Sequence, residues 1–212
     1  RYWRLALDEP LRLDGRGYVE RFLDVTSLAI ADRLPAGRVG IAMSGGLDSS
    51  AVTTLAARQV SGGMAVFTGA FREGPEFDET AHAGAVADLI GARSHVVYPT
   101  ETEFVDLLPR LVWHMDEPAA GPGLFPQYMV SRLAARHVKV CLGGQGGDEL
   151  FGGYARYLVA YLEQALRASI VGDSAEGSDA LPLEGLCEGL GTLKQYRPML
   201  RRFVAEDFLG DA

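Results

Sequence analysis

Two glycine-rich stretches contain the residues whose types and spacing are suited to chemistry. The first, SGGLDSS at residues 44–50, combines two glycines and three serines with the carboxylate of Asp48. Glycines let the backbone approach an anion closely, and successive amides beside hydroxyl groups can hold a phosphate. Because a carboxylate would repel a bare phosphate, Asp48 predicts an anion that arrives with a divalent cation such as Mg²⁺.

The second stretch, GGQGGDELFGGY at residues 143–154, holds the carboxylates of Asp148 and Glu149 among repeated glycines. Such a density of glycine is costly in backbone entropy unless the conformation of the loop requires it. If the two stretches meet, Asp48 and Asp148 could share one Mg²⁺. The structural alternatives are a helix junction capped by Asp48 or Ser49, and a turn with solvated acids.

Both stretches follow short apolar runs, which we interpret as buried strands. Strands that alternate with helices predict an α/β, doubly wound, mainly parallel five-stranded sheet with helices on both faces and a helical C-terminal extension. Loops at the carboxyl ends of such strands converge on one crevice. The expected strands are residues 38–43, 63–70, 93–98 and 137–142, and the expected helices are residues 18–34, 49–60, 78–90, 101–113, 127–136 and 154–168.

Composition excludes several classes of protein. The net charge of −8 over 212 residues argues against a nucleic-acid partner, and no apolar run is long enough to span a membrane. Cys141 and Cys187 are too few for a disulfide framework, and no Cys/His spacing indicates a zinc site. We therefore expect a cytoplasmic protein. Lys139 and Lys194 are the only lysines, so a mechanism that needs a catalytic lysine has few candidates.

Together the two stretches resemble the synthetase domain of the asparagine synthetase family, within the N-type ATP pyrophosphatases. SGGLDSS matches the pyrophosphate loop of that family, and GGQGGDELFGGY matches its second signature. The intervening FTGAFREGPEFDETAHAGAVAD and WHMDEPAAGPGLFPQYMVSRLA look like the middle of that domain, and YWRL resembles its beginning, after a glutaminase domain. The resemblance covers roughly residues 2–157 and implies an adenine nucleotide alpha hydrolase-like fold.

This resemblance implies an ATP-dependent amide-forming synthetase. A substrate carboxylate, with aspartate as the first candidate, attacks the α-phosphate of ATP and releases pyrophosphate; ammonia or an amine then attacks the acyl-adenylate. The implied metal ligands for Mg²⁺ are Asp48 and Asp148, and the candidate catalytic residues are Gln145 and Asp148. The implied nucleotide-binding residues are Ala42, Ser44, Gly45, Gly46, Asp48, Ser49, Ser50, Thr68, Gly69, Asp78, Gly143 and Gly144.

Three departures from the family pattern keep alternatives open. Gln145 stands where the family often has a catalytic glutamate, and an amide cannot accept a proton. Pro122 stands where aspartate-specific members can carry an arginine, so the substrate need not be aspartate. The later catalytic lysine of the family lies beyond this sequence, with Lys194 as the only late lysine. A relative that forms a lactam or macrocycle, and a non-catalytic or fragmentary ATP-binding module, are the alternatives.

We expect residues 1–168 to form the ATP-pyrophosphatase core, residues 169–180 a mobile linker, and residues 181–212 the start of a truncated helical region. The expected partners are ATP, the carboxylate substrate and a glutaminase domain in a longer protein, with a homodimer left open. The remaining candidates have structural explanations. The four histidines (His82, His95, His114 and His137) show no metal spacing, and Cys141 is expected to be a buried small apolar residue.

Overall fold

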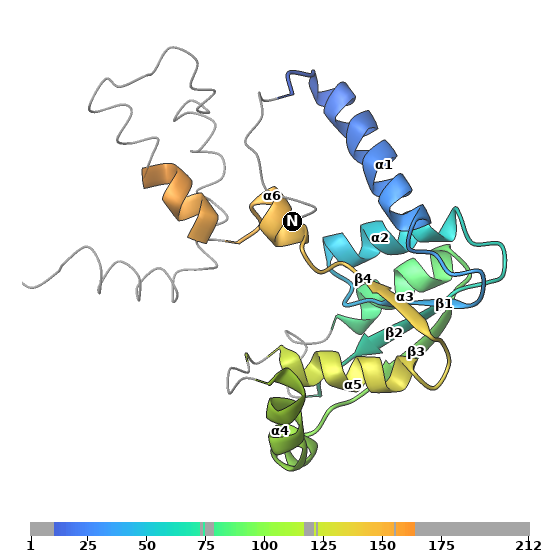
Figure 1. Cartoon of the computed structure of the whole chain (residues 1–212), viewed down its shortest axis with the longest axis vertical. Coiled ribbons are helices and arrows are strands. Elements are labelled where there is room, and N and C mark those ends of the chain that lie inside the picture. The colour runs from blue at the N-terminus through green and yellow to red at the C-terminus, as the bar shows by residue number, and fades with distance from the viewer. Residues whose placement is uncertain are drawn as a thin grey trace, which may run out of the picture. The chain divides into compact units, whose positions relative to one another are not determined.

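The computed structural model describes residues 11–72, 74, 79–116, 121, 123–154 and 156–163. The chain divides into two compact units, residues 1–145 and residues 146–212 (Figure 1). The expected linker and C-terminal helical region lie outside the described residues, as do Asp78 and Pro122. No helix in the described part of the chain is long and apolar enough to cross a membrane.

The first unit is built on a four-stranded sheet in the order β3-β2-β1-β4. Its strands are β1 (Val39–Ala42), β2 (Ala65–Gly69), β3 (Arg93–Val97) and β4 (Val140–Gly143). All neighbouring pairs are parallel. The doubly wound α/β class is confirmed, although the described residues contain four strands where we expected five.

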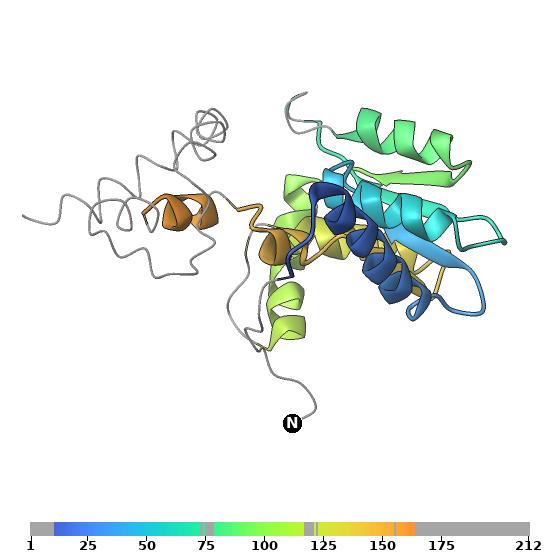
Figure 2. The same cartoon turned by 90° about the horizontal axis from the view of Figure 1, so that it is seen from above.

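Helices cover both faces of this sheet, as Figures 1 and 2 show. The helices on one face are α1 (Gly15–Ala31), α2 (Leu47–Ala57) and α3 (Thr80–Leu89), and those on the other are α4 (Glu101–Met115) and α5 (Leu124–Ala134). Each was expected from the apolar spacing. The expected start of the second helix at residue 49 was late, because α2 begins at Leu47. Asp48 therefore lies in the first turn of that helix, where a carboxylate is stabilised by the helix dipole.

Local side-chain hydrogen bonds define where the outer helices begin. The Asp14 carboxylate caps α1 by accepting from the Gly17 N–H at 2.8 Å. Thr100 and Glu103 form a capping box at the start of α4, which satisfies two otherwise unpaired donors. Glu103 also accepts a hydrogen bond from Arg132 of α5 at 3.0 Å, so the same residue links α4 to α5.

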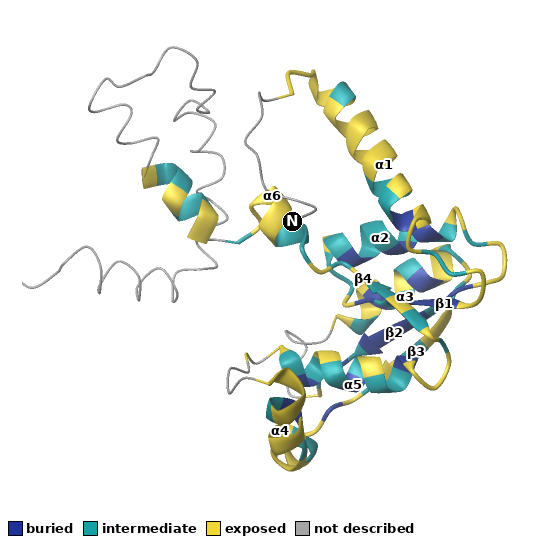
Figure 3. Ribbon diagram, in the orientation of Figure 1, coloured by how far each residue is buried: buried dark blue, intermediate teal, exposed yellow. Residues whose placement is uncertain are grey.

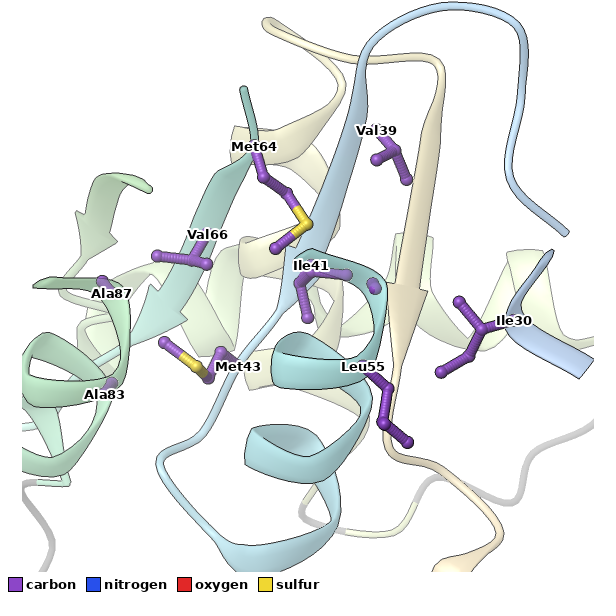
Figure 4. Packing of buried hydrophobic residues seen from close by; sticks show 10 residues of the cluster. Ile30, Val39, Ile41, Met43, Leu55, Met64, Val66, Ala83 and Ala87 are labelled. Carbon is purple, nitrogen blue, oxygen red and sulfur yellow. The ribbon is translucent and has the colours of Figure 1, made fainter. Parts of the chain in front are cut away.

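The core lies where the two central strands meet the helices, and Figure 3 shows buried residues in β1 and β2. Val39 and Ile41 of β1 pack with Leu55 of α2 in one cluster (Figure 4). A second cluster on the opposite face contains Phe125 and Met129 of α5. Full burial of such a side chain contributes about 1.5–3 kcal/mol. The packed sheet therefore fixes the positions at which the loops at its edges begin and end.

The second unit begins with the short helix α6 (Gly147–Phe151). The glycines on either side of it, Gly146 and Gly152, have φ values of 96° and 69°, a left-handed conformation that favours glycine. Residues 156–163 are helical, which confirms the described part of the helix expected over residues 154–168.

Candidate functional site

The two glycine-rich stretches leave the sheet from neighbouring strands. SGGLDSS follows β1 and the second stretch begins at the end of β4, where Ala42 pairs with Gly143 in the register of the sheet. On the other side of β1, Ala42 pairs with Phe67 of β2, directly before Thr68 and Gly69. The carboxyl ends of β1, β2 and β4 thus bring together residues that were predicted to bind a nucleotide.

Hydrogen bonds within SGGLDSS fix its shape. The Ser44 Oγ and Ser49 Oγ atoms lie 3.1 Å apart, and Ser44 Oγ accepts from the Gly46 N–H at 3.2 Å. Ser49 donates to the Gly46 carbonyl at 3.1 Å. The side chain of Ser50 makes no hydrogen bond within the described residues. Ser44 and Ser49 therefore hold the loop closed, while the hydroxyl of Ser50 is available as a donor.

The first turn of α2 presents unpaired backbone donors at the bottom of this loop. Its N-cap is Gly46, which offers no side chain to the helix amides. The Ser50 N–H bonds back to the Gly46 carbonyl at 3.1 Å, whereas the amides of residues 47–49 have no acceptor in the described part of the chain. Unpaired amides at the positive end of a helix dipole attract anions. The loop and the helix start can together receive a phosphate group.

Two glycines allow this loop to be approached closely by its neighbours. A Cβ atom on Gly144 would lie 2.6 Å from the Ser49 backbone nitrogen, so the start of the second stretch packs directly on the first turn of α2. Gly45 has a φ of 94°, and a Cβ atom there would lie 2.8 Å from the Glu79 carbonyl oxygen. The sequence analysis predicted that Gly45 binds the nucleotide, but it did not predict that Gly45 packs against the segment before α3.

Asp48 and Thr68 have polar side chains without a hydrogen-bonding partner among the described residues. The half-buried carboxylate of Asp48 forms no hydrogen bond or ion pair with any described residue. The hydroxyl of Thr68 is buried, with 1% of the residue exposed, and likewise has no partner among the described residues. Most buried polar groups in proteins are hydrogen-bonded. A bound ligand with its cation would supply partners for groups of this kind, so the donor set fits a metal-bound phosphate.

The other predicted residues divide between the two units. Gln145 is exposed and ends the first unit, whereas Asp148 lies in the first turn of α6, in the second unit. A Mg²⁺ site shared by Asp48 and Asp148 stays a prediction. Among the described residues, no three His, Cys, Asp or Glu side chains gather into a metal cage.

A hydrogen-bonded pair in the second unit was missed by the sequence analysis. The Tyr154 hydroxyl donates to the Glu149 carboxylate at 2.9 Å, and the Arg156 guanidinium lies 4.1 Å from the centre of the Tyr154 ring. This hydrogen bond lowers the pKa of Glu149 and raises the pKa of Tyr154. Only the spacing of an acid and a tyrosine within the glycine-rich stretch could have signalled the pair.

The expectation that Cys141 is buried was wrong, because its side chain is exposed. Val140 and Leu142, on either side of it, pack against the core cluster on the α1–α3 face of the sheet. Cys141 therefore points to the opposite face. There α5 packs on β1, β2 and β3, and Cys141 on the edge strand β4 is left exposed.

A parallel sheet with a glycine-rich loop and a helix start at its carboxyl edge is typical of the class of doubly wound nucleotide- and phosphate-binding domains. Within that class, the chain belongs to the asparagine synthase family, whose model matches residues 21–208.

Similar proteins from three organisms agree with this family. A Mycobacterium tuberculosis protein assigned to the glutamine-hydrolysing asparagine synthetases is 48% identical over 119 residues, which are 56% of this chain and 18% of that protein. Asparagine synthetase [glutamine-hydrolyzing] 1 of Bacillus subtilis is 38% identical over the same shares. Asparagine synthetase [glutamine-hydrolyzing] 3 of Arabidopsis thaliana is 32% identical over 54% of this chain and 22% of its own length. The matched part of the chain therefore spans about a fifth of each relative.

Among solved structures, an NH3-dependent NAD synthetase from Campylobacter jejuni matches 91% of this chain and 88% of its own, with a TM-score of 0.43 and 14% identity. No conclusion is drawn from that match.

Proposed function

We propose that this chain is the ATP-activating part of an amide-forming ligase that makes asparagine from aspartate. The observation that supports the proposal most strongly is the carboxyl edge of the sheet. There, Gly144 of the second glycine-rich stretch packs on the backbone of Asp48 and Ser49. The amides of residues 47–49 and the carboxylate of Asp48 have no partner among the described residues. A loop that combines amide donors with a lone carboxylate suits an anion accompanied by a metal ion.

In the proposed reaction, the loop binds the β- and γ-phosphates of ATP. The substrate carboxylate attacks the α-phosphate, the bond to the bridging oxygen breaks, and pyrophosphate leaves with its bonding electrons. The first-turn amides of α2 and the Ser50 hydroxyl offset the charge that develops on this leaving group. Such preorganised donors stabilise a transition state without reorganising. The remaining acceleration comes from holding the carboxylate and ATP in line.

Mg²⁺, when bound, would neutralise part of the phosphate charge. Protein Mg²⁺ sites in phosphate-transfer enzymes usually supply one or two carboxylates and leave the other positions to phosphate and water. Asp48 and Asp148 are the proposed pair, so a cage made by the protein alone is not needed. The buried hydroxyl of Thr68, at the end of β2, is proposed to face the nucleoside.

The acceptor half of the reaction is proposed from the relatives, which are named as glutamine-hydrolysing asparagine synthetases. We propose that ammonia reaches this domain from a glutaminase domain in the longer polypeptide. Gln145 would then orient the substrate by hydrogen bonds, because its amide cannot act as a general base.

The experiment is an ATP–pyrophosphate exchange assay on the longer polypeptide that contains this chain. We expect exchange to require Mg²⁺ and aspartate, while glutamate and β-alanine serve as matched carboxylate controls. The 212-residue chain alone is expected to bind ATP–Mg²⁺ weakly and to form little amide. If another carboxylate and not aspartate supported exchange, the proposed substrate would be wrong. If exchange needed no carboxylate, the proposed reaction would be wrong.

A further inference from the structure

Two adjoining cavities lie at the opposite edge of the sheet, where the strands begin. The first has a volume of about 280 Å³ and is lined in part by Arg38, Arg93, His95 and His137. The second, of about 400 Å³, is lined in part by Arg38, Arg136, His137 and Lys139. The cavities share Arg38, His137 and Val138. We call these two cavities the amino-edge site.

The lining of the amino-edge site has a charge opposite to that of the whole chain. The chain carries 28 acidic against 20 basic residues, yet none of the described residues that line either cavity is Asp or Glu. Nor does any described carboxylate form an ion pair with one of its three arginines or with Lys139. The first cavity therefore has two permanent cations in its lining and the second has three, with Arg38 in both. They have no counter-charge from the described residues, which favours an anionic ligand.

Two histidines stand together within this lining. The rings of His95 and His137 have centroids 4.1 Å apart, and Phe67 stacks on His95 at 5.2 Å. Burial lowers the pKa of His95, and the neighbouring His137 and Arg93 lower it further. The groups that face His95 in this lining are thus all basic. An anion placed among them would favour the protonated form of His95.

We propose that the amino-edge site binds a small multivalent oxyanion of the phosphate class. A metal ion is disfavoured because four cations would repel it, although two imidazoles alone could ligate one. A long nucleic acid is disfavoured by the overall charge of −8. Cavities of this size suit inorganic phosphate or a small phosphate monoester, which share the chemistry that arginine recognises. The proposal uses no residue of the carboxyl edge and does not rest on the ligase reaction.

The test is a titration of the full chain with inorganic phosphate, followed by NMR of the histidine side chains. His114 serves as the internal control, since it lines neither cavity, whereas His82 lies beside Gly45 of SGGLDSS and would respond to phosphate bound at that loop. We expect the signals of His95 and His137 to shift and the pKa of His95 to rise by about one unit, which makes binding about tenfold tighter at low pH. A parallel titration with glycerol phosphate distinguishes inorganic phosphate from a phosphate monoester as the ligand. A site for a monoester binds glycerol phosphate more tightly than inorganic phosphate, whereas a site for inorganic phosphate does not.

Substitutions at the amino-edge site and elsewhere test whether phosphate binds through the basic residues of the lining. Arg93→Gln should weaken phosphate binding by roughly fivefold or more, because one charge-assisted contact is lost. Arg16→Gln is the matched control, since Arg16 lies on α1 and pairs with Glu20. Asp48→Asn should leave phosphate binding at the amino edge unchanged. A shift of His114 equal to those of His95 and His137, no shift in His95 and His137, or an effect of Arg16→Gln equal to that of Arg93→Gln would overturn the proposal.

Discussion

The carboxyl and amino edges of one parallel sheet present polar groups in different ways. At the carboxyl edge, the donors are main-chain amides at the start of α2, and glycines bring other backbone segments against them. At the amino edge, the polar groups are arginine, lysine and histidine side chains that line two cavities. The first arrangement is fixed by the fold, whereas the second depends on the positions of long side chains.

This difference has consequences for how each edge responds to substitution and to pH. Backbone amides neither titrate nor change rotamer, so the carboxyl edge should be sensitive to backbone packing and insensitive to pH near neutrality. The amino edge contains His95, an imidazole whose ordinary pKa of 6.5 lies close to that range. A single added methyl group should therefore abolish nucleotide binding at the carboxyl edge. A change of about one pH unit should instead alter phosphate binding at the amino edge.

Gly144→Ala should produce the largest effect. The added Cβ atom would lie 2.6 Å from the Ser49 backbone nitrogen, and a backbone atom cannot rotate away as a side chain can. We expect the free energy of unfolding to fall by about 1–3 kcal/mol, the usual cost of overpacking. Nucleotide binding should be lost at the same time, because the start of α2 must move. Chemical denaturation and calorimetric titration with ATP measure the two effects.

Gly143→Ala is the matched control for that variant. A Cβ atom on Gly143 meets no atom within 4 Å, so stability should change little even though the substitution is only one position away. If the two variants lost the same stability, the close approach of Gly144 to α2 would not be what constrains the loop.

A smaller effect is expected at the amino edge from the titration of His95. Its pKa is lowered in the folded chain from an ordinary value of 6.5, first by burial and then by His137 and Arg93. The unfolded chain therefore binds the proton more readily, and the contribution of His95 to stability falls as the pH drops below about 6.5. In Arg93→Gln the pKa of His95 should rise toward its ordinary value. A side-chain NMR titration that gave His95 a pKa above 6.5 would contradict this.

Much of the carboxyl edge could be predicted from the sequence because its residues are contiguous. SGGLDSS shows its glycines, hydroxyls and carboxylate within seven positions, directly after an apolar run that forms β1. The sequence could not show that Ser49 is engaged with Ser44 and Gly46, since that depends on the first turn of α2. Nor could it show that Gly144 meets this turn, because the contact joins segments about a hundred residues apart.

The amino edge was not predicted, and the reason is again physical. Its basic residues come from the beginnings of β1, β3 and β4, and no periodicity relates them along the chain. The sequence shows no metal spacing among the histidines, and it could not show that His95 and His137 lie side by side, because that contact depends on the parallel register of the strands. The exposure of Cys141 has a similar origin, because it depends on which strands α5 covers.

The central claim is that SGGLDSS binds a metal-bound phosphate through the amides of α2 and the carboxylate of Asp48. The most direct test measures ATP affinity with and without Mg²⁺ in the unmodified chain and in Asp48→Asn, which keeps the size of the side chain. The unmodified chain should bind ATP more tightly with Mg²⁺. In Asp48→Asn, the gain in ATP affinity from Mg²⁺ should be smaller by a factor of at least about ten. Removing a residue that only hydrogen-bonds to a metal ligand already costs about this much, and Asp48 is proposed to be a ligand itself. An equal gain from Mg²⁺ in both proteins would contradict the claim.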